Sequence, residues 1–256
     1  MSIIDLNCDM GESWGNRGVG EDCEVMPHIS SANIACGFHG GDPMVMRYTI
    51  DLALKHHVAI GAHPSFHDLA GFGRNNMDLT ANEVYHLVLY QVAALKGMVE
   101  VCGSRVHHVK PHGALYNMAA KWAPYARAIA SAIRDLDAKI ILYGLSGSEL
   151  IAAGEAAGLQ TCSEVFADRT YQDDGSLTPR QMSNALITDK AKAIEQVMMM
   201  VGEGKVRTVS GKLIPIRAET ICIHGDHEGG AIFASELNHA LRAAGFNIRA
   251  MEQKHN

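Results

Sequence analysis

The sequence predicts an α/β fold in which a mainly parallel sheet of seven strands closes into a barrel. Short apolar runs alternate with helical patterns along the 256 residues, which is typical of strands that helices cover on both faces. No GxGxxG motif follows the first run, and polar residues follow nearly every run instead of gathering at one point. That distribution favours a closed or nearly closed barrel over an open, doubly wound sheet.

Each predicted strand is short, and it is followed by a polar or glycine-rich turn and then by a helical pattern. Strand, turn and helix in this order are the unit from which parallel sheets are built. In chain order, the predicted strands are 3–8, 33–36, 58–62, 106–109, 140–143, 161–167 and 220–223.

Three of the predicted helices have clear start or stop signals. Pro43 stands where the helix after the second strand begins, and proline suits the first helical position. Thr80 and Glu83 form a capping box in front of a long apolar pattern. Gly245 follows the last helical pattern and is expected to end it.

Two further helix starts are predicted in the second half of the chain. Ser146 and Glu149 have the spacing of a second capping box, and the helix they open is expected to end at Gly158. Thr178 and Pro179 combine an N-cap residue with a proline at the first helical position, which predicts another helix from this point.

The chain is expected to form one domain over 1–256, because no linker or low-complexity segment divides it. Two stretches fall outside the strand–helix repeat. Residues 14–27 form a glycine-rich excursion after the first strand. Residues 206–217 have the pattern of a hairpin insertion that turns at 210–212.

Composition excludes several classes of partner. The formal net charge is -6, so no basic face for nucleic acid is expected. No apolar run approaches the roughly 18 residues of a membrane span, and the first residues lack the pattern of a signal peptide. The six cysteines form no CxxC pair, which is typical of reduced, buried thiols and predicts a cytoplasmic protein.

Ionisable residues follow six of the seven predicted strands, mostly beside glycine or proline. Any one of them alone is more often structural, but the carboxyl ends of parallel strands meet at one face of a barrel. Their convergence therefore predicts a functional site there. The candidates, in chain order, are Asp9, Glu12, His39, Asp42, His63, Lys110, His112, Asp168, Arg169, His224 and Asp226.

Six polar, glycine-rich motifs follow one another along the chain. They are DLNCDMGES at 5–13, SANIACGFHGGDP at 31–43, GAHPSFHDLAGFGR at 61–74, HVKPHGALYN at 108–117, EVFADRTYQDDGSLTPR at 164–180 and CIHGD at 222–226. In this order they resemble the successive motifs of the LamB/YcsF family. The resemblance implies a seven-stranded, TIM-like (β/α) barrel of the glycoside hydrolase/deacetylase type, in agreement with the seven strands counted above.

The same resemblance implies an activity. The family includes the A subunits of 5-oxoprolinase, so the expected reaction is ATP-dependent hydrolysis of 5-oxo-L-proline to L-glutamate. Two partner subunits, B and C, are expected to take part. The chain has no GxxxxGK motif, so ATP is expected at a site of another type or at one supplied by a partner.

Chemical type suggests a role for each candidate. Proton transfer is expected from the catalytic candidates Asp9, Glu12, His39, His63 and His112. Substrate binding is expected from Asp42, Lys110, Asp168, Arg169, His224 and Asp226, with Lys110 or Arg169 holding a carboxylate. The alternative for Asp168 and Arg169 is an internal ion pair that holds their loop.

No residue is assigned as a metal ligand from the sequence, and a divalent metal is left open. His63 and His67 have a spacing that superficially resembles the zinc motif of polysaccharide deacetylases. Pro64 argues against a helix starting there, and no paired-aspartate motif follows the first strand. A metal-dependent amide or carbohydrate deacetylase and a non-catalytic substrate-binding subunit remain the alternative functions.

Overall fold

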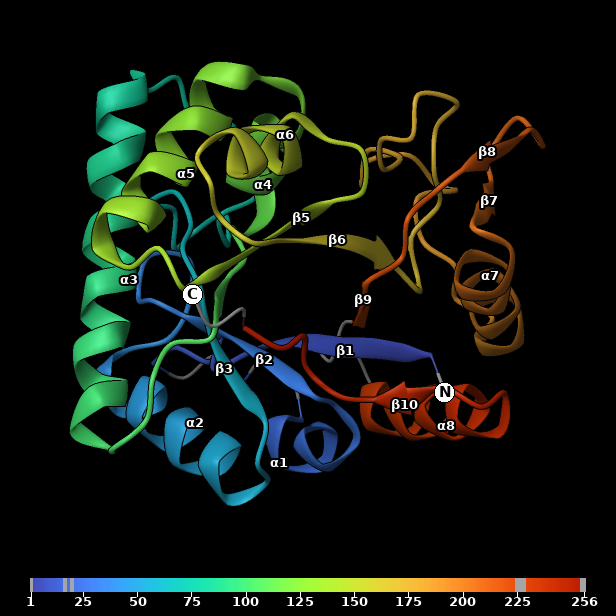
Figure 1. Ribbon diagram of the computed structural model, residues 1–256, viewed down its shortest axis with the longest axis horizontal. Coiled ribbons are helices and arrows are strands. Elements are labelled where there is room, and N and C mark those ends of the chain that lie inside the picture. Colours follow the sequence, from blue (N-terminus) through green and yellow to red (C-terminus); the bar gives the residue numbers. More distant parts are fainter. Residues whose placement is uncertain (1, 16–17, 19–20, 224–228, 254–256) are drawn as a thin grey trace.

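The structure is a computed structural model that describes residues 2–15, 18, 21–223 and 229–253. Its centre is a closed barrel of seven parallel strands, in the order β1-β2-β3-β4-β5-β6-β9, and β9 pairs again with β1 (Figure 1). The predicted barrel is therefore confirmed. The strands are β1 (Ile3–Met10), β2 (Ser31–Ala35), β3 (Ala59–His63), β4 (His108–Val109), β5 (Ile141–Leu145), β6 (Thr161–Phe166) and β9 (Thr220–Ile223).

An eighth strand, β10 (Asn247–Ile248), joins the sheet beside the start of β1. The first two residues of β1 pair with β10, and the next four pair with β9. Because β1 pairs with β10 at its start and with β9 further along, the last strand can join the sheet while the barrel stays closed. The sequence pattern did not predict β10, because two residues are too few to show a periodicity.

Helices surround the barrel (Figure 1). The longest, α3 (Ala81–Val101), packs against α5 (Ala123–Leu136), and α5 packs against α6 (Glu149–Ala156). Within the part of the chain that the structure describes, no helix is long and apolar enough to cross a membrane. The helices are α1 (Asp22–Val25), the short 3-10 helix η1 (Met26–His28), α2 (Pro43–Lys55), α3 (Ala81–Val101), α4 (Gly113–Lys121), α5 (Ala123–Leu136), α6 (Glu149–Ala156), α7 (Lys190–Glu203) and α8 (Gly230–Ala243).

Two predicted helix starts are confirmed. Helix α2 begins at Pro43, and the capping box of Thr80 and Glu83 opens α3 with both of its hydrogen bonds present. The capping box satisfies backbone N–H groups that the first turn of a helix leaves without partners. Gly245, which follows α8, adopts a positive φ of 87°, as expected of a residue that ends a helix.

The other two predicted starts are wrong. Residues 178–189 form turns and a single bridge, and the next helix is α7, which Asp189 caps. The Thr178 hydroxyl bonds to Thr170 and Gln172 instead of capping a helix. Helix α6 is capped by Ser148, two residues beyond the predicted Ser146. The Ser146 hydroxyl instead accepts from the backbone N–H of Arg217. In both places a tertiary hydrogen bond of the loop therefore overrides the local signal.

The sequence predicts a hairpin over 206–217, and the antiparallel pair β7 (Lys205–Arg207) and β8 (Leu213–Pro215) lies there, beginning one residue earlier. The described part of 14–27 contains α1 and the first two residues of η1, which ends at His28. A carboxylate oxygen of Asp22 accepts a hydrogen bond of 2.8 Å from the backbone N–H of Gly11, which ties this stretch to the end of β1. The one-domain organisation of 1–256 stays a prediction.

Polar side chains fill much of the barrel interior. On β1, Asp5 and Asn7 alternate with Leu6 and Cys8, as a strand requires when its two faces differ. The amide of Asn7 donates to Glu164 on β6 and to Thr220 on β9, so these strands are linked across the barrel. Buried polar groups in such a network have their hydrogen bonds made by one another.

Candidate active site

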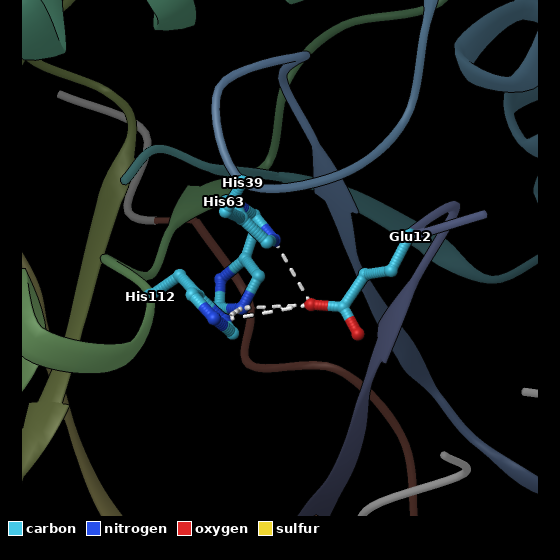
Figure 2. A group of neighbouring side chains, drawn as sticks. All are labelled: Glu12, His39, His63 and His112. Atoms are coloured by element: carbon cyan, nitrogen blue, oxygen red, sulfur yellow. Dashed lines mark hydrogen bonds and ion pairs between the residues drawn. The ribbon is translucent and has the colours of Figure 1, made fainter. Parts of the chain in front are cut away.

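Four buried side chains converge at the carboxyl ends of the first four strands: Glu12, His39, His63 and His112 (Figure 2). Each offers one ligand-type atom, and these atoms all lie within 4.8 Å of one another. All four were predicted from their positions after the strands. We call this group the Glu–His cluster.

One carboxylate oxygen is the centre of the Glu–His cluster. The Oε1 atom of Glu12 lies 2.9 Å from His39 Nε2, 3.4 Å from His112 Nδ1 and 3.9 Å from His63 Nε2. The last two nitrogens lie 2.9 Å from each other. The three rings therefore turn nitrogen atoms toward one oxygen.

Two of these rings are fixed by hydrogen bonds from their outward-facing nitrogen atoms to backbone carbonyls. His63 Nδ1–H donates to the carbonyl of Lys110 at 2.6 Å, and His112 Nε2–H donates to the carbonyl of Phe72 at 2.9 Å. The rings of His39 and His112 are stacked, with centroids 3.8 Å apart. The ring orientations are thus fixed by the fold, as a preorganised site requires.

Glycines let the loops of the Glu–His cluster approach closely. A Cβ on Gly40 would lie 2.6 Å from the carbonyl oxygen of Glu12. Gly73 has a φ of +64°, and a Cβ there would lie 2.8 Å from the Cβ of His39. Side chains at these two positions would push the loops apart, which explains why glycines stand beside the ionisable residues.

Burial determines the charge state of two histidines. It lowers the pKa of His39 to about 3. Burial, followed by the neighbouring His39 and His63, also lowers the pKa of His112 well below its ordinary value. Both imidazoles are therefore neutral near pH 7, since water no longer stabilises the charged form. Neutral rings accept protons and bind metals, as imidazolium ions do not.

A second ionised group lies beside the cluster. The ammonium of Lys110 lies 3.0 Å from Asp9 Oδ1 and 2.9 Å from Glu164 Oε1, and it donates to Cys222 Sγ at 3.0 Å. Burial alone would lower the pKa of Lys110, but Asp9, Cys222 and Glu164 outweigh it and raise the pKa above its ordinary value. Lys110 therefore stays charged, and its charge is balanced within the protein.

Asp9 joins the two groups, because its second oxygen, Oδ2, lies 3.2 Å from His63 Nε2. A cavity of about 50 Å³ opens over this junction. A wider groove of about 730 Å³ adjoins it and shares Arg74, Arg169 and Arg180 with its lining. The carboxylates and histidines thus form the floor of the site, and arginines form its wall.

The structure does not bring every predicted residue to the cavity. Asp42 instead caps α2, where its carboxylate accepts from the N–H groups of Met44 and Val45. Asp168 is buried, and its backbone oxygen accepts from Ile187. His224 and Asp226 lie outside the described residues. His67 is exposed, packs on Phe38 and does not belong to the Glu–His cluster.

Arg169 does line the cavity, but much of its guanidinium is used by its own loop. It donates to the carbonyls of Thr178, at 2.6 Å, and of Ala185, at 3.3 Å. Burial lowers its pKa to about 10, so it remains charged at neutral pH. The structure adds Arg74, Tyr116 and Arg180, which were not predicted as site residues. The motifs FGR and TPR were the available signals for the two arginines.

A carboxylate–histidine cluster at the carboxyl ends of a closed parallel barrel defines an α/β-barrel protein with an enzyme-type site. Residues 4–256 match the LamB/YcsF family, and the chain belongs to that family. The predicted resemblance is therefore confirmed over nearly the whole chain.

Known relatives match this chain from end to end. The 5-oxoprolinase A subunit of Tolumonas auensis is 56% identical over 251 residues, which is 98% of this chain and 100% of the relative. A protein of the same name from Geobacillus thermodenitrificans is 56% identical over 254 residues, 99% of each chain. The crystal structure of a lactam utilization protein from Thermus thermophilus superposes with a TM-score of 0.91 at 44% identity, covering 97% of this chain and 100% of that one.

Proposed function

We propose that this chain is the A subunit of an ATP-dependent 5-oxoprolinase, which hydrolyses 5-oxo-L-proline to L-glutamate. One observation carries the proposal: a single cavity joins a buried carboxylate–histidine cluster to arginines. This cavity combines side chains that can transfer protons with side chains that can bind an anion. The relatives named as A subunits of 5-oxoprolinase and the neighbour named as a lactam utilization protein support the same class of substrate.

The substrate is a small anion with a carboxylate, an amide N–H and an amide carbonyl. The arginines at the cavity wall are the groups we assign to the carboxylate, in particular Arg74 and Arg180, which are exposed at its mouth. Asp9 lies at the floor and is suited to accept from the amide N–H. The small size of the cavity restricts the lactam itself to its entrance and the adjoining groove.

Lys110 is not suited to the carboxylate role that the sequence suggested for it. Its ammonium already lies within 3.0 Å of Asp9 and of Glu164. Binding a further anion there would require one of these buried pairs to separate. We therefore propose that Lys110 fixes the position and charge of Asp9, and that arginines bind the substrate.

Amide resonance makes the lactam carbonyl a poor electrophile, which accounts for the proposed use of ATP. Transfer of the γ-phosphoryl group to the lactam oxygen turns that oxygen into a leaving group and releases ADP. A first water then adds to the ring carbon and the C–N bond opens, which gives the free amine and a γ-carboxyl phosphate. A second water hydrolyses this acyl phosphate to L-glutamate and phosphate. We propose Glu12 as the base for the first water, with His63 and His112 beside it to hold and pass the proton.

The groove next to the cavity is our proposed place for the ATP phosphates. Its lining includes Arg74, Lys121 and Arg180, and its volume of about 730 Å³ is within the range of ligand sites. Cations positioned around the transferring phosphoryl group are the main protein contribution to such reactions. The relatives are named as one subunit of several, which supports a complex, and we propose that subunits B and C complete it.

Reconstitution tests this function. We expect little glutamate or ADP from the purified chain with 5-oxoproline and ATP, and substantial amounts once subunits B and C are added. 2-Pyrrolidinone lacks the carboxylate, so its kcat/KM should be about ten- to a hundredfold lower. Robust ATP-coupled turnover by the chain alone would contradict partner dependence. Absence of turnover with all three subunits would contradict the proposed reaction.

A further inference from the structure

Two ring nitrogens of the Glu–His cluster, His63 Nε2 and His112 Nδ1, face each other, and both are acceptors when the rings are neutral. His63 has its hydrogen on Nδ1, because that atom donates to the Lys110 carbonyl, and its Nε2 lone pair faces the cluster. His112 has its hydrogen on Nε2, which donates to the Phe72 carbonyl, and its Nδ1 lone pair faces the cluster. These two lone pairs meet at 2.9 Å with no hydrogen between them.

Two lone pairs at hydrogen-bond distance repel unless a positive species lies between or beside them. The carboxylate of Glu12 adds a third acceptor, 3.4 Å from His112 Nδ1. His39 donates from Nε2 to Oε1 of this carboxylate at 2.9 Å, and its Nδ1 atom is buried without a hydrogen-bond partner in the described part of the chain. The cluster thus concentrates electron pairs in a buried volume, where uncompensated polar groups are costly.

We propose that Glu12, His39, His63 and His112 bind one divalent transition-metal ion. Zinc–nitrogen and zinc–oxygen bonds are about 2.0–2.2 Å long, so tetrahedral ligand atoms lie roughly 3.3–3.5 Å apart. The separations of 2.9, 3.4 and 3.9 Å in the structure lie around that value, and all four atoms are within 4.8 Å of one another. Small side-chain adjustments therefore bring them into one coordination sphere.

The donor set selects the class of metal. Three imidazoles and one carboxylate suit zinc, cobalt, nickel or iron, whereas magnesium and calcium prefer oxygen ligands. His63 and His112 each donate their other ring N–H to a backbone carbonyl. Hydrogen bonds of this kind fix the tautomer of a metal-binding histidine. This proposal does not rest on the proposed lactam chemistry, because metal binding can be measured without substrate.

The surroundings leave room for one more ligand. The cavity of about 50 Å³ borders Glu12, His63 and His112, and it is large enough for a water molecule. Asp9 Oδ2 lies 3.2 Å from His63 Nε2 at the same border. A metal-bound water there would have a lowered pKa, and in the metal-bound state Asp9, in place of Glu12, would accept its proton, because Glu12 would then be a ligand.

A direct test uses the whole purified chain, stripped with a chelator and titrated with ZnCl₂ or CoCl₂. We expect about one bound equivalent of metal per chain, a visible ligand-field band for the cobalt form, and a higher Tm with zinc than without it. Glu12→Gln and His63→Gln should each weaken zinc binding at least about a hundredfold. Removing a side chain that binds the metal directly lowers the affinity more than removing a hydrogen-bond partner of such a side chain.

Two controls keep the outcome decisive. His107→Gln removes a half-buried histidine outside the cluster and should bind zinc as the wild type does. X-ray absorption of the zinc-bound wild type needs no variant and should show about three imidazole ligands. Wild-type protein that binds no stoichiometric metal would overturn the proposal and favour a shared proton. Folded Glu12→Gln and His63→Gln variants with unchanged affinity, or a metal with fewer than two imidazole ligands, would also overturn it.

Discussion

Lys110 is a buried positive charge whose partners are both inside the protein. Its ammonium lies 3.0 Å from Asp9 and 2.9 Å from Glu164, and all three side chains are largely out of solvent. The net contribution of such pairs to stability is small, because desolvation offsets their attraction. Removing one partner is costly, however, because the remaining charges have no water to replace it.

Lys110→Met should therefore lower the free energy of unfolding by about 3–5 kcal/mol. The double variant Lys110→Met/Glu164→Gln should recover part of this loss, because it removes one of the two stranded carboxylates. Lys192→Met, on the exposed surface of α7, serves as the control and should change stability by less than about 0.5 kcal/mol. Urea denaturation measures all three, and a loss below about 1 kcal/mol for Lys110→Met would contradict the account.

Residue positions after the strands predicted the four members of the Glu–His cluster, because strand ends converge in any parallel barrel. The same rule misplaced Asp42, which stands before a proline and caps α2. It also missed Arg74 and Arg180, because their loops approach the cavity through tertiary contacts that have no periodic signal. Residue type and strand order thus predicted the floor of the site, and they did not predict its wall.

At the scale of elements, the loops after β1 and β2 depend on glycine for their close contact. Gly40 lies against the backbone of Glu12, where a Cβ would come within 2.6 Å of the carbonyl oxygen. Gly97, on α3, has open space around its would-be Cβ. The two positions therefore form a matched pair for the same substitution.

Gly40→Ala should destabilise the protein by about 1–3 kcal/mol, because the loop must move to relieve the overlap. The same movement shifts Glu12, so metal affinity and turnover should fall as well. Gly97→Ala should instead stabilise the protein by about 0.5–1 kcal/mol, because alanine is the better helix former. Equal effects of both substitutions on stability and metal binding would contradict a close-contact role for Gly40.

Asp22 begins α1 and connects it to β1, and burial raises the pKa of its carboxyl to about 6. The folded-state pKa thus lies above the unfolded value near 3.9, so the folded protein binds the proton more tightly. Ionisation of Asp22 therefore lowers the free energy of unfolding as pH rises from about 4 to 6, and the whole of this loss is present above pH 6.

Asp22→Asn should raise the free energy of unfolding by about 1–2 kcal/mol at pH 8, a value reduced from the full shift because the side chain is partly exposed. The amide oxygen of asparagine can still accept from Gly11. Urea denaturation of both proteins between pH 4 and pH 8 measures the difference. A gain that is the same at every pH would show that the titration of Asp22 is not its cause.

Elements with several local signals were predicted well. The start of α3 has a cap, an acidic residue and an apolar pattern that all agree, whereas the segment after Thr178 has only a cap-like pair. That segment is ordered by Arg169 and by the Thr170–Thr178 contact, which come from elsewhere in the fold. Local signals therefore fail where long-range polar contacts determine the backbone path.

At the scale of the whole molecule, the barrel brings residues from four separate strands to one end. The sequence predicted this closure from the absence of a GxGxxG motif after the first strand and from the spread of polar residues after nearly every strand. It did not predict the polar interior, in which Asn7 and Glu164 link β1 to β6. The alternation of Asp5, Asn7 and Asp9 on β1 was the available signal, and it was outweighed by the apolar residues between them.

Participation of the Glu–His cluster in lactam hydrolysis is the proposal on which the function of this chain depends. Its most direct test compares glutamate formation from 5-oxoproline and ATP by complexes reconstituted with wild-type chain, Glu12→Gln and the exposed-residue control Glu195→Gln. We expect Glu12→Gln to lower kcat by at least about a hundredfold, and Glu195→Gln to leave it unchanged. A folded Glu12→Gln chain that supports wild-type turnover would contradict the proposal and would favour the alternative of a non-catalytic subunit.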